Sequence, residues 1–210
     1  MLESLIEQVV SWTMQTISSL GYFGIFLTML IESASIPLPS EIIMPFSGFL
    51  VSKGEFSFIP AVVTGAFGNL VGSILMYCLG YFGQEAVIKK FVRGWGKLLI
   101  SESELETGEK WFRKYGDLIV LGSRVLPAVR TFISLPAGIA RVPFIRFCVL
   151  TFIGSLVWCV FLTFLGVKLG ENWMILEPFF RKFDVFIVFG GIIILIAYFY
   201  HKYRKAFNGK

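Results

Sequence analysis

Two hydrophobic stretches of this chain are each interrupted by prolines and by charged residues. The first, residues 31–48, carries glutamates, and the second, residues 123–138, carries arginines. A charged side chain is costly in hydrocarbon, and a proline breaks the helix that would satisfy the backbone there. A chain that combines both features twice is therefore expected to line a polar cavity within a membrane, with carboxylates from one half and guanidiniums from the other.

The composition excludes an ordinary soluble domain. Of the 210 residues, 56% are hydrophobic, and the mean hydropathy is +0.76. Uncharged runs at residues 58–82, 147–167 and 185–200 approach or exceed the roughly 20 apolar residues that a membrane-spanning helix needs. We therefore predict an all-α integral membrane protein whose last transmembrane helix lies, with a basic tail, in residues 171–210.

Residues 84–117 differ from these runs because they are dense in charge. Their apolar residues recur at helical spacing, which is typical of amphipathic helices on a membrane surface. This segment and the tail after His201 hold most of the lysines and arginines. The positive-inside rule predicts that both, and hence the C-terminus, are cytoplasmic. Residues 1–19 are predicted to form an N-terminal amphipathic helix, whose side of the membrane the sequence leaves open.

The two halves of the chain repeat one another. Gly68-Asn69-Leu70-Val71 and Gly154-Ser155-Leu156-Val157 each begin 12 residues before a further glycine, Gly80 and Gly166 respectively. Upstream of these, Pro45-Phe46-Ser47-Gly48 parallels Pro136-Ala137-Gly138.

This repeat predicts the topology of the core, residues 20–170. Each unit would be a Pro-broken re-entrant hairpin, at about residues 20–50 and 117–141, followed by one transmembrane helix. A unit with an odd number of crossings must be inserted upside down the second time. The predicted core is therefore an inverted repeat, with the two broken hairpins meeting near the middle of the membrane.

Two motifs carry a resemblance to a known family. The first is Glu-x4-Pro-x-Pro-x-Glu, formed by Glu32, Pro37, Pro39 and Glu41 and followed by Gly48. The second is Arg-x-x-Pro-x-x-Arg-Thr, formed by Arg124, Pro127, Arg130 and Thr131 and followed by Pro136-Ala137-Gly138. In this order, with a basic amphipathic segment between them, the motifs resemble those of the DedA family of membrane proteins, also called the SNARE-associated or VTT-domain family.

The resemblance implies two re-entrant hairpins, no cofactor and a role in lipid translocation. Bacterial members of the family are associated with moving undecaprenyl phosphate or phosphatidylethanolamine across the cytoplasmic membrane, often with dependence on the proton motive force. Eukaryotic relatives behave as phospholipid scramblases. The expected partners are membrane lipids, a phosphate-bearing lipid substrate and protons, with no nucleic acid, and the expected location is a bacterial cytoplasmic membrane. The sequence indicates no oligomeric state.

Arg124 and Arg130 are the candidate ligands of a lipid phosphate. A continuous helix would turn them to different faces, and Pro127 between them removes that constraint. A guanidinium stays charged and offers a planar fork to phosphate oxygens. The alternative role is a structural ion pair with Glu32 or Glu41, and the two roles are compatible.

Glu32 and Glu41 are the candidate proton-coupling or headgroup-binding residues. A carboxylate that exchanges between an arginine-paired and a protonated state would couple proton entry to the release of an anionic headgroup. The alternative for Glu41 is a capping role at the start of the returning half-helix.

Several prolines and glycines are predicted to shape the hairpins rather than to do chemistry. Prolines stop helices and free carbonyls to line the cavity, and glycines let helices approach closely within a membrane. The hairpin-shaping residues are Pro37, Pro39, Pro45, Gly48, Pro127, Pro136 and Gly138. Asn69 is expected to make an interhelical hydrogen bond. The three cysteines lack metal-ligand spacing, so we predict no metal site or disulfide.

The leading functional prediction is a flippase that moves undecaprenyl phosphate for carrier-lipid recycling. The alternative within the same class is a phosphatidylethanolamine flippase or a phospholipid scramblase, in which a glutamate would bind the amine. An enzyme is disfavoured, because the hairpins contain hydroxyl residues but no histidine or cysteine to activate them. An ion channel would be distinguished by its conductance.

Overall fold

The computed structural model describes residues 2–34, 38–83, 116–117, 120–123, 130 and 133–176. Every regular element in these ranges is helical, so the all-α prediction is confirmed for them. The chain divides into two compact units, Met1–Trp173 and Met174–Lys210. The second unit contributes only residues 174–176 to the described part, and the predicted C-terminal transmembrane helix and the charged segment 84–115 lie outside it.

The first half begins with a helix–break–helix unit. α1 spans Leu2–Leu20 and α2 spans Tyr22–Ser33; between them Gly21 takes a φ of +61°, which glycine adopts without a steric penalty. α3 spans Ser40–Ser52, and Pro39 is its N-cap. The prediction that a helix breaks near Pro39 is therefore confirmed, whereas Pro37 lies outside the described residues.

Pro45 does not stop a helix, contrary to our prediction, because it lies inside α3. A proline at this position removes only the hydrogen bond from its own nitrogen to the carbonyl of Glu41. α3 is buried along almost its whole length, and this packing holds the helix together. Pro136 also lies inside a helix, α8 (Ser134–Ile139). It is in the first turn, where a backbone N–H has no helical acceptor to lose.

Two helices are long and apolar enough to be candidate membrane spans. α4 comprises Phe58–Gly83, and α9 comprises Phe144–Leu169, which continues through the 3-10 helix η3, Gly170–Ile175. A 26-residue helix is about 39 Å long, enough to cross a hydrocarbon core of about 30 Å.

The outer surface of α9 is apolar and its inner surface is more polar. The exposed stripe consists of Ile145, Val149, Ile153, Val157, Phe161 and Phe164. By contrast, Thr151, Ser155 and Thr163 are buried. A continuous exposed apolar face, with polar groups turned inward, is the pattern of a helix in lipid rather than in water.

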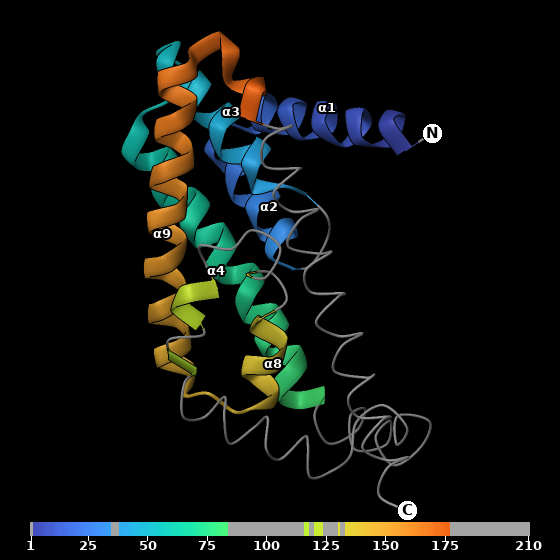
Figure 1. Ribbon diagram of the computed structural model, residues 1–210, viewed down its shortest axis with the longest axis vertical. Coiled ribbons are helices and arrows are strands. Elements are labelled where there is room, and N and C mark those ends of the chain that lie inside the picture. The colour runs from blue at the N-terminus through green and yellow to red at the C-terminus, as the bar shows by residue number, and fades with distance from the viewer. Residues whose placement is uncertain are drawn as a thin grey trace, which may run out of the picture. The chain divides into compact units, whose positions relative to one another are not determined.

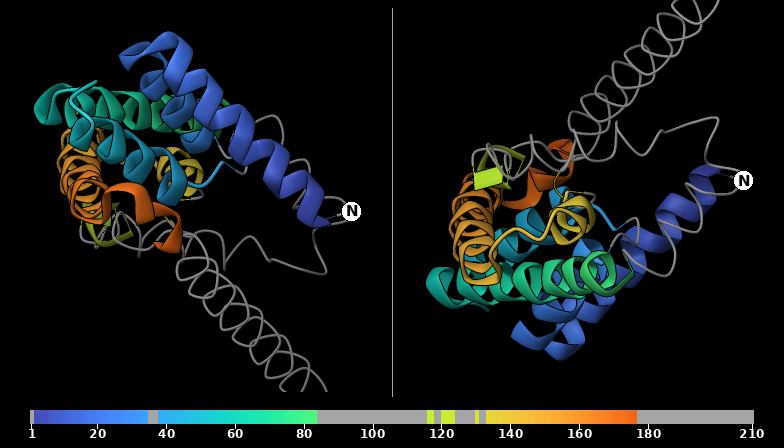
Figure 2. Two further views of the ribbon diagram at one scale, coloured as in Figure 1. Left: turned by 90° about the horizontal axis from the view of Figure 1, so that it is seen from above. Right: turned by 90° about the horizontal axis from the view of Figure 1, so that it is seen from below.

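The short helices α3 and α8 each pack on the long helix of the other half (Figures 1 and 2). α3, from the first half, lies against α9, and α8, from the second half, lies against α4. α2 also packs on α4, and α4 packs on α9. α3 and α8 thus each rest on the long helix that belongs to the other half of the chain, whereas α2 rests on the long helix of its own half.

Glycines make these contacts close. A Cβ atom on Gly48 would collide with the carbonyl of Thr163, and one on Gly166 would collide with the carbonyl of Pro45. At the other crossing, between α8 and α4, a Cβ on Gly138 would collide with the carbonyl of Tyr77. Close helix packing at these glycines, which we predicted because small residues let helices approach one another in a membrane, is confirmed.

Candidate functional site

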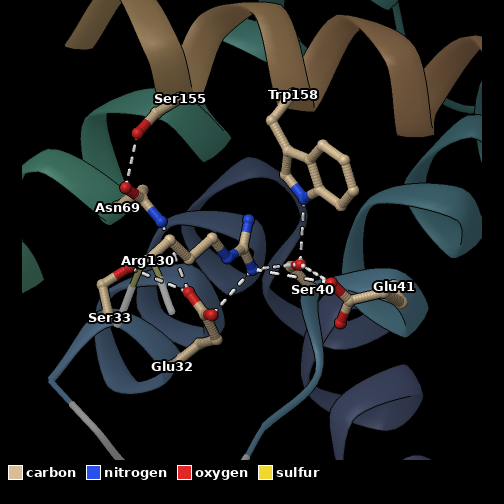
Figure 3. Close-up of polar contacts among 8 residues, drawn as sticks. All are labelled: Glu32, Ser33, Ser40, Glu41, Asn69, Arg130, Ser155 and Trp158. Atoms are coloured by element: carbon tan, nitrogen blue, oxygen red, sulfur yellow. Dashed lines mark hydrogen bonds and ion pairs between the residues drawn. The ribbon is translucent and has the colours of Figure 1, made fainter. Parts of the chain in front are cut away.

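Side chains from α2, α3, α4 and α9 converge on one guanidinium, that of Arg130 (Figure 3). Glu32 and Ser33 come from the last turn of α2, and Ser40 and Glu41 from the first turn of α3. The other contributors are Asn69 in the middle of α4 and Ser155 and Trp158 on α9. The C-terminal end of α2 and the N-terminal end of α3 lie close together, which places Glu32 and Glu41 beside one another.

Arg130 bridges that break. Its Nη2 atom donates a hydrogen bond to Oε1 of Glu32 over 2.7 Å. The same nitrogen donates to Oγ of Ser40 and lies 3.9 Å from Oε1 of Glu41. The ion pair with Glu32 is therefore direct, whereas Glu41 interacts with Arg130 mainly through its charge and through Ser40.

Glu32 is held on both of its oxygens. Oε2 accepts a hydrogen bond from Oγ of Ser33 at 2.8 Å and one from Nδ2 of Asn69 at 3.3 Å. Asn69 in turn accepts a hydrogen bond from Oγ of Ser155. This chain of hydrogen bonds fixes the carboxylate of Glu32 to both long helices. The interhelical hydrogen bond expected of Asn69 is confirmed.

Ser40 connects Glu41 to the tryptophan of α9. Its Oγ donates to Oε1 of Glu41 at 3.0 Å and accepts from Nε1 of Trp158 at 3.3 Å. The Cζ atom of Arg130 lies 5.5 Å from the centroid of the Trp158 ring. At that distance the ring attracts the cation through its quadrupole.

Glu41 lies at the N-terminal end of α3 without capping it through a hydrogen bond. The N-cap is Pro39, and no side chain makes a cap hydrogen bond there. A carboxylate in the first turn still interacts favourably with the positive end of the helix dipole. The helix end thus stabilises the charge of Glu41 at a place where Arg130 is not in direct contact.

The three charged residues of this cluster are withdrawn from water. Arg130 is 2% exposed, Glu32 4% and Glu41 5%. Desolvation costs several kcal/mol for each buried ion, and an ion pair offsets that cost only with good geometry and further hydrogen bonds. With every group ionised, the three described residues hold one more negative charge than positive. Among the described residues, two carboxylates thus face one guanidinium.

The structure brings together three of the four charged residues singled out from the sequence: Glu32, Glu41 and Arg130. The alternative role weighed for Arg130, an ion pair with a glutamate, is observed. Arg124 and Pro127 lie outside the described residues. Gly48 and Gly138 lie away from the cluster, at the two helix crossings.

Sequence reasoning missed Ser40 and Trp158 as members of the site, and it placed Asn69 in a purely structural role. One signal was available for Asn69, because it is the only carboxamide in the uncharged run 58–82. The repeat puts Ser155 at the matching position of the second half. Trp158 carries no comparable signal, since a tryptophan in an apolar helix is ordinary.

Within the described ranges, no group of three or more histidines, cysteines, aspartates or glutamates is placed to hold a metal ion. Cys78, Cys148 and Cys159 are free thiols.

Comparison with protein families matches residues 38–168 to the VTT domain. The chain belongs to the VTT-domain family, also called the DedA family. The matched region begins just before α3 and ends at the last turn of α9, so it includes Glu41 of α3, Arg130 and the polar face of α9. The resemblance drawn from the two motifs is confirmed, and the chain is a membrane protein of this family.

Similar proteins cover nearly the whole chain. The protein named undecaprenyl phosphate transporter A from Bacillus subtilis (strain 168) is 35% identical over 204 residues, 97% of each chain. The protein of the same name from Staphylococcus aureus (strain NCTC 8325 / PS 47) is 29% identical over 94% of this chain and 96% of its own. A Lactococcus lactis (strain IL1403) protein named alkaline phosphatase-like protein is 33% identical over 87% of each chain. No solved structure gives a significant match.

Proposed function

We propose that the chain carries a phosphate-bearing lipid, most specifically undecaprenyl phosphate, across a bacterial cytoplasmic membrane. The observation that carries the proposal is the guanidinium of Arg130, which is buried beside the candidate membrane-spanning helices and paired with Glu32 and Glu41. An intramembrane ionisable group of this kind marks a substrate or proton pathway. The similarity to proteins named undecaprenyl phosphate transporter A supports the choice of lipid.

The two halves would form the inverted repeat that alternating access requires. Matching contacts support this: Gly48 meets the carbonyl of Thr163, and Gly138 meets the carbonyl of Tyr77. Thr163 and Tyr77 each precede the glycine of their own repeat, Gly166 or Gly80, by three residues. In such a fold the hairpins enter from opposite faces, and rocking one half against the other moves the site between the two sides.

Substrate binding would exchange one anion for another at Arg130. A phosphate monoester offers oxygens to the same Nη2 atom that now donates to Glu32 and Ser40. While the lipid phosphate occupies the guanidinium, Glu32 loses its counter-ion but keeps Ser33 and Asn69 as donors. The polyprenyl chain would remain in the bilayer.

Proton coupling would follow from the loss of the ion pair between Glu32 and Arg130. A carboxylate that loses Arg130 in a dry site is destabilised as an anion, so proton uptake by Glu32 would accompany phosphate binding. When the phosphate leaves, Glu32 would release the proton and pair with Arg130 again. Glu41, which accepts a hydrogen bond from Ser40, would remain close to the site throughout.

The second glutamate, Glu41, favours one second candidate, a zwitterionic phospholipid with an amine such as phosphatidylethanolamine. Its phosphate would take Arg130, and its ammonium group would take Glu41, whose nearest approach to the arginine is 3.9 Å. This candidate requires no change in the protonation of Glu32.

We propose no catalytic step, although one relative is named alkaline phosphatase-like protein. The hydroxyl at the centre of the site, Ser40, already donates to Glu41 and accepts from Trp158. A phosphatase would release inorganic phosphate, which can be measured beside transport.

The test is transport by the full chain in proteoliposomes. Undecaprenyl phosphate and a labelled phosphatidylethanolamine would be compared with and without an imposed pH gradient, and free phosphate would be assayed in the same samples. The variants are Arg130→Lys, which keeps the charge without the planar fork, and Glu32→Gln, which keeps the shape of the side chain but removes the charge and one of the two acceptor oxygens. Arg146→Gln is the control, because Arg146 is exposed and has only a 3.7 Å pair with exposed Asp117.

Transport of undecaprenyl phosphate is expected for the wild type and for Arg146→Gln, with a reduction of about tenfold or more in Arg130→Lys. Glu32→Gln is expected to remove the response to the pH gradient. Movement of phosphatidylethanolamine alone would establish the second candidate. Release of phosphate would overturn the transport proposal in favour of an enzyme, and full gradient-driven transport by Glu32→Gln would overturn the proton-coupling step.

A further inference from the structure

A second site lies where α4 ends and α9 begins. A cavity of about 460 Å³ opens there, with walls that include Tyr77, Tyr81, Phe82, Phe144 and Arg141. No residue of the Arg130 cluster lines it. We propose that this cavity binds an anionic phospholipid of the surrounding leaflet, with the lipid phosphate on Arg141 and the apolar chain against the aromatic side chains.

The backbone of Arg141 is the first argument. Its φ is +52°, and it is the only non-glycine residue with a positive φ among those described. The strain arises at the turn that ends α8. There the N–H of Arg141 donates to the carbonyl of Gly138 at 3.0 Å, and the N–H of Val142 donates to the carbonyl of Ala137 at 3.1 Å.

The first half of the chain makes the same turn with a glycine. After α3, the N–H of Gly54 donates to the carbonyl of Val51 at 3.0 Å, and the N–H of Glu55 donates to the carbonyl of Leu50 at 3.0 Å. The φ of Gly54 is +79°. Glycine is the usual residue at this helix-ending position, because it has no Cβ to clash.

An arginine at a position that suits glycine has a conformational cost, since left-handed backbone is disfavoured for residues with a side chain. The helix-ending turn does not need the side chain, as Gly54 shows. The turn therefore does not by itself require the guanidinium of Arg141. Strained residues of this kind cluster at ligand-binding positions.

The cavity wall beside Arg141 is rigid. The hydroxyl of Tyr77 donates to the carbonyl of Val142 at 2.6 Å, which ties α4 to the turn after α8. The Tyr77 ring packs against Phe144 and Tyr81, with centroid distances of 5.6 Å and 6.1 Å. Cζ of Arg141 lies 5.5 Å from the centroid of the Tyr81 ring, so the cation stands over an aromatic wall of the cavity.

The chemistry of this site fits a phospholipid. The apolar part of the wall is open to the lipid, since Phe82 is 75% exposed and Phe144 47%. Tyrosine and arginine side chains are typical of the membrane–water interface, where anionic lipid headgroups lie. A guanidinium binds a phosphate through two parallel hydrogen bonds. The charge and the apolar wall are thus complementary to the two parts of one lipid molecule.

The experiment measures retention of phosphatidylglycerol by the full detergent-purified chain, using native mass spectrometry over a lipid titration. The variants are Arg141→Gly, which removes the charge and restores the residue of the first-half turn, and Arg141→Lys, which keeps a charge. Arg146→Gln is the matched control, because Arg146 is another exposed arginine only five residues along the chain that does not line the cavity. Soluble glycerol phosphate serves as a competitor, and thermal unfolding reports on folding.

Arg141→Gly is expected to weaken phosphatidylglycerol binding by about tenfold or more, because a charge-assisted hydrogen bond is lost. Its unfolding temperature is expected to equal or exceed that of the wild type, because the backbone strain is relieved. Arg141→Lys is expected to bind at an intermediate level, and Arg146→Gln to bind like the wild type.

Equal losses in Arg141→Gly and Arg146→Gln would overturn the proposal, since that pattern reports only general charge attraction. Unchanged binding in Arg141→Gly, or displacement of the lipid by glycerol phosphate, would also overturn it. Because the readout is binding rather than transport, and the variants leave Arg130 intact, the outcome is independent of whether the Arg130 site carries a lipid.

Discussion

The hydroxyl of Ser155 donates a hydrogen bond to the side-chain carbonyl of Asn69, and the two residues occupy the same position in the two halves of the chain. Each follows the first glycine of the matching sequences Gly68-Asn69-Leu70-Val71 and Gly154-Ser155-Leu156-Val157. In a fold with two-fold pseudo-symmetry, equivalent positions meet only close to the symmetry axis. This contact therefore supports an axis that passes between α4 and α9, beside the carboxylate of Glu32.

The Asn69–Ser155 contact is expected to stabilise the protein measurably. A double-mutant cycle of Asn69→Ala and Ser155→Ala should give a coupling free energy of about 0.5–1 kcal/mol, the range found for hydrogen bonds between helices in membranes. Unfolding in mixed detergent measures it. As a control, a cycle of Asn69→Ala with Thr13→Ala should show no coupling, because Thr13 is a buried threonine on α1 that donates a hydrogen bond within its own helix. A coupling free energy in this control equal to that of the Asn69–Ser155 pair would contradict the prediction.

Removal of the guanidinium is expected to destabilise the fold more than removal of either acid. Arg130→Met leaves two buried carboxylates without their cation, and breaking a buried ion pair in this way costs about 3–5 kcal/mol. The double variant Arg130→Met with Glu32→Gln should recover part of this loss, since it removes a buried unpaired charge. Thermal unfolding at neutral pH tests the order, and no recovery in the double variant would count against a direct pair.

The two glutamates are expected to differ in their contributions. Glu32 is 2.7 Å from Arg130, whereas Glu41 is 3.9 Å away and is stabilised by the start of α3 and by Ser40. Glu32→Gln should therefore lower the unfolding temperature more than Glu41→Gln does. The opposite order would mean that Glu41, not Glu32, is the main counter-ion of Arg130 in the membrane.

Alanine at the helix crossings is expected to be poorly tolerated. In Gly48→Ala and Gly138→Ala the new methyl group meets a backbone carbonyl of the opposite long helix, and such overpacking costs about 1–3 kcal/mol. Gly83→Ala is the control, because a Cβ atom there meets nothing within 4 Å. If all three variants unfolded at the wild-type temperature, the close approach of these helices would be refuted.

Trp158 is expected to position Arg130 and Ser40 through separable contacts. Trp158→Phe keeps an aromatic ring near the guanidinium but loses the hydrogen bond from Nε1 to Ser40. We expect a loss in transport of roughly fivefold for one neutral hydrogen bond, and a larger loss in Trp158→Ala, which also removes the ring. Equal rates for the two variants would show that the ring does not act on Arg130.

The sequence predicted the membrane class, the family and the charged centre because these depend on local patterns. Uncharged runs indicated α4 and α9, and charges placed next to prolines indicated Glu32, Glu41 and Arg130. The partners on other helices were harder to predict, since Ser40 and Trp158 enter the site through tertiary packing that no local pattern encodes. Tertiary packing also explains the wrong prediction at Pro45. The low helix propensity of proline predicted a helix end, but Pro45 lies inside the buried helix α3.

The packing of α3 on α9 and of α8 on α4 has a consequence for how the chain is synthesised. During translation α2, α3 and α4 are made before α8 and α9 exist, so α3 at first lacks the long helix on which it rests. Over the same interval Glu32 and Glu41 have no guanidinium beside them, and a bare carboxylate in hydrocarbon is strongly disfavoured. The Glu32–Arg130 ion pair can therefore form only after the second half has been made, and the order of synthesis makes assembly of the two halves a late event.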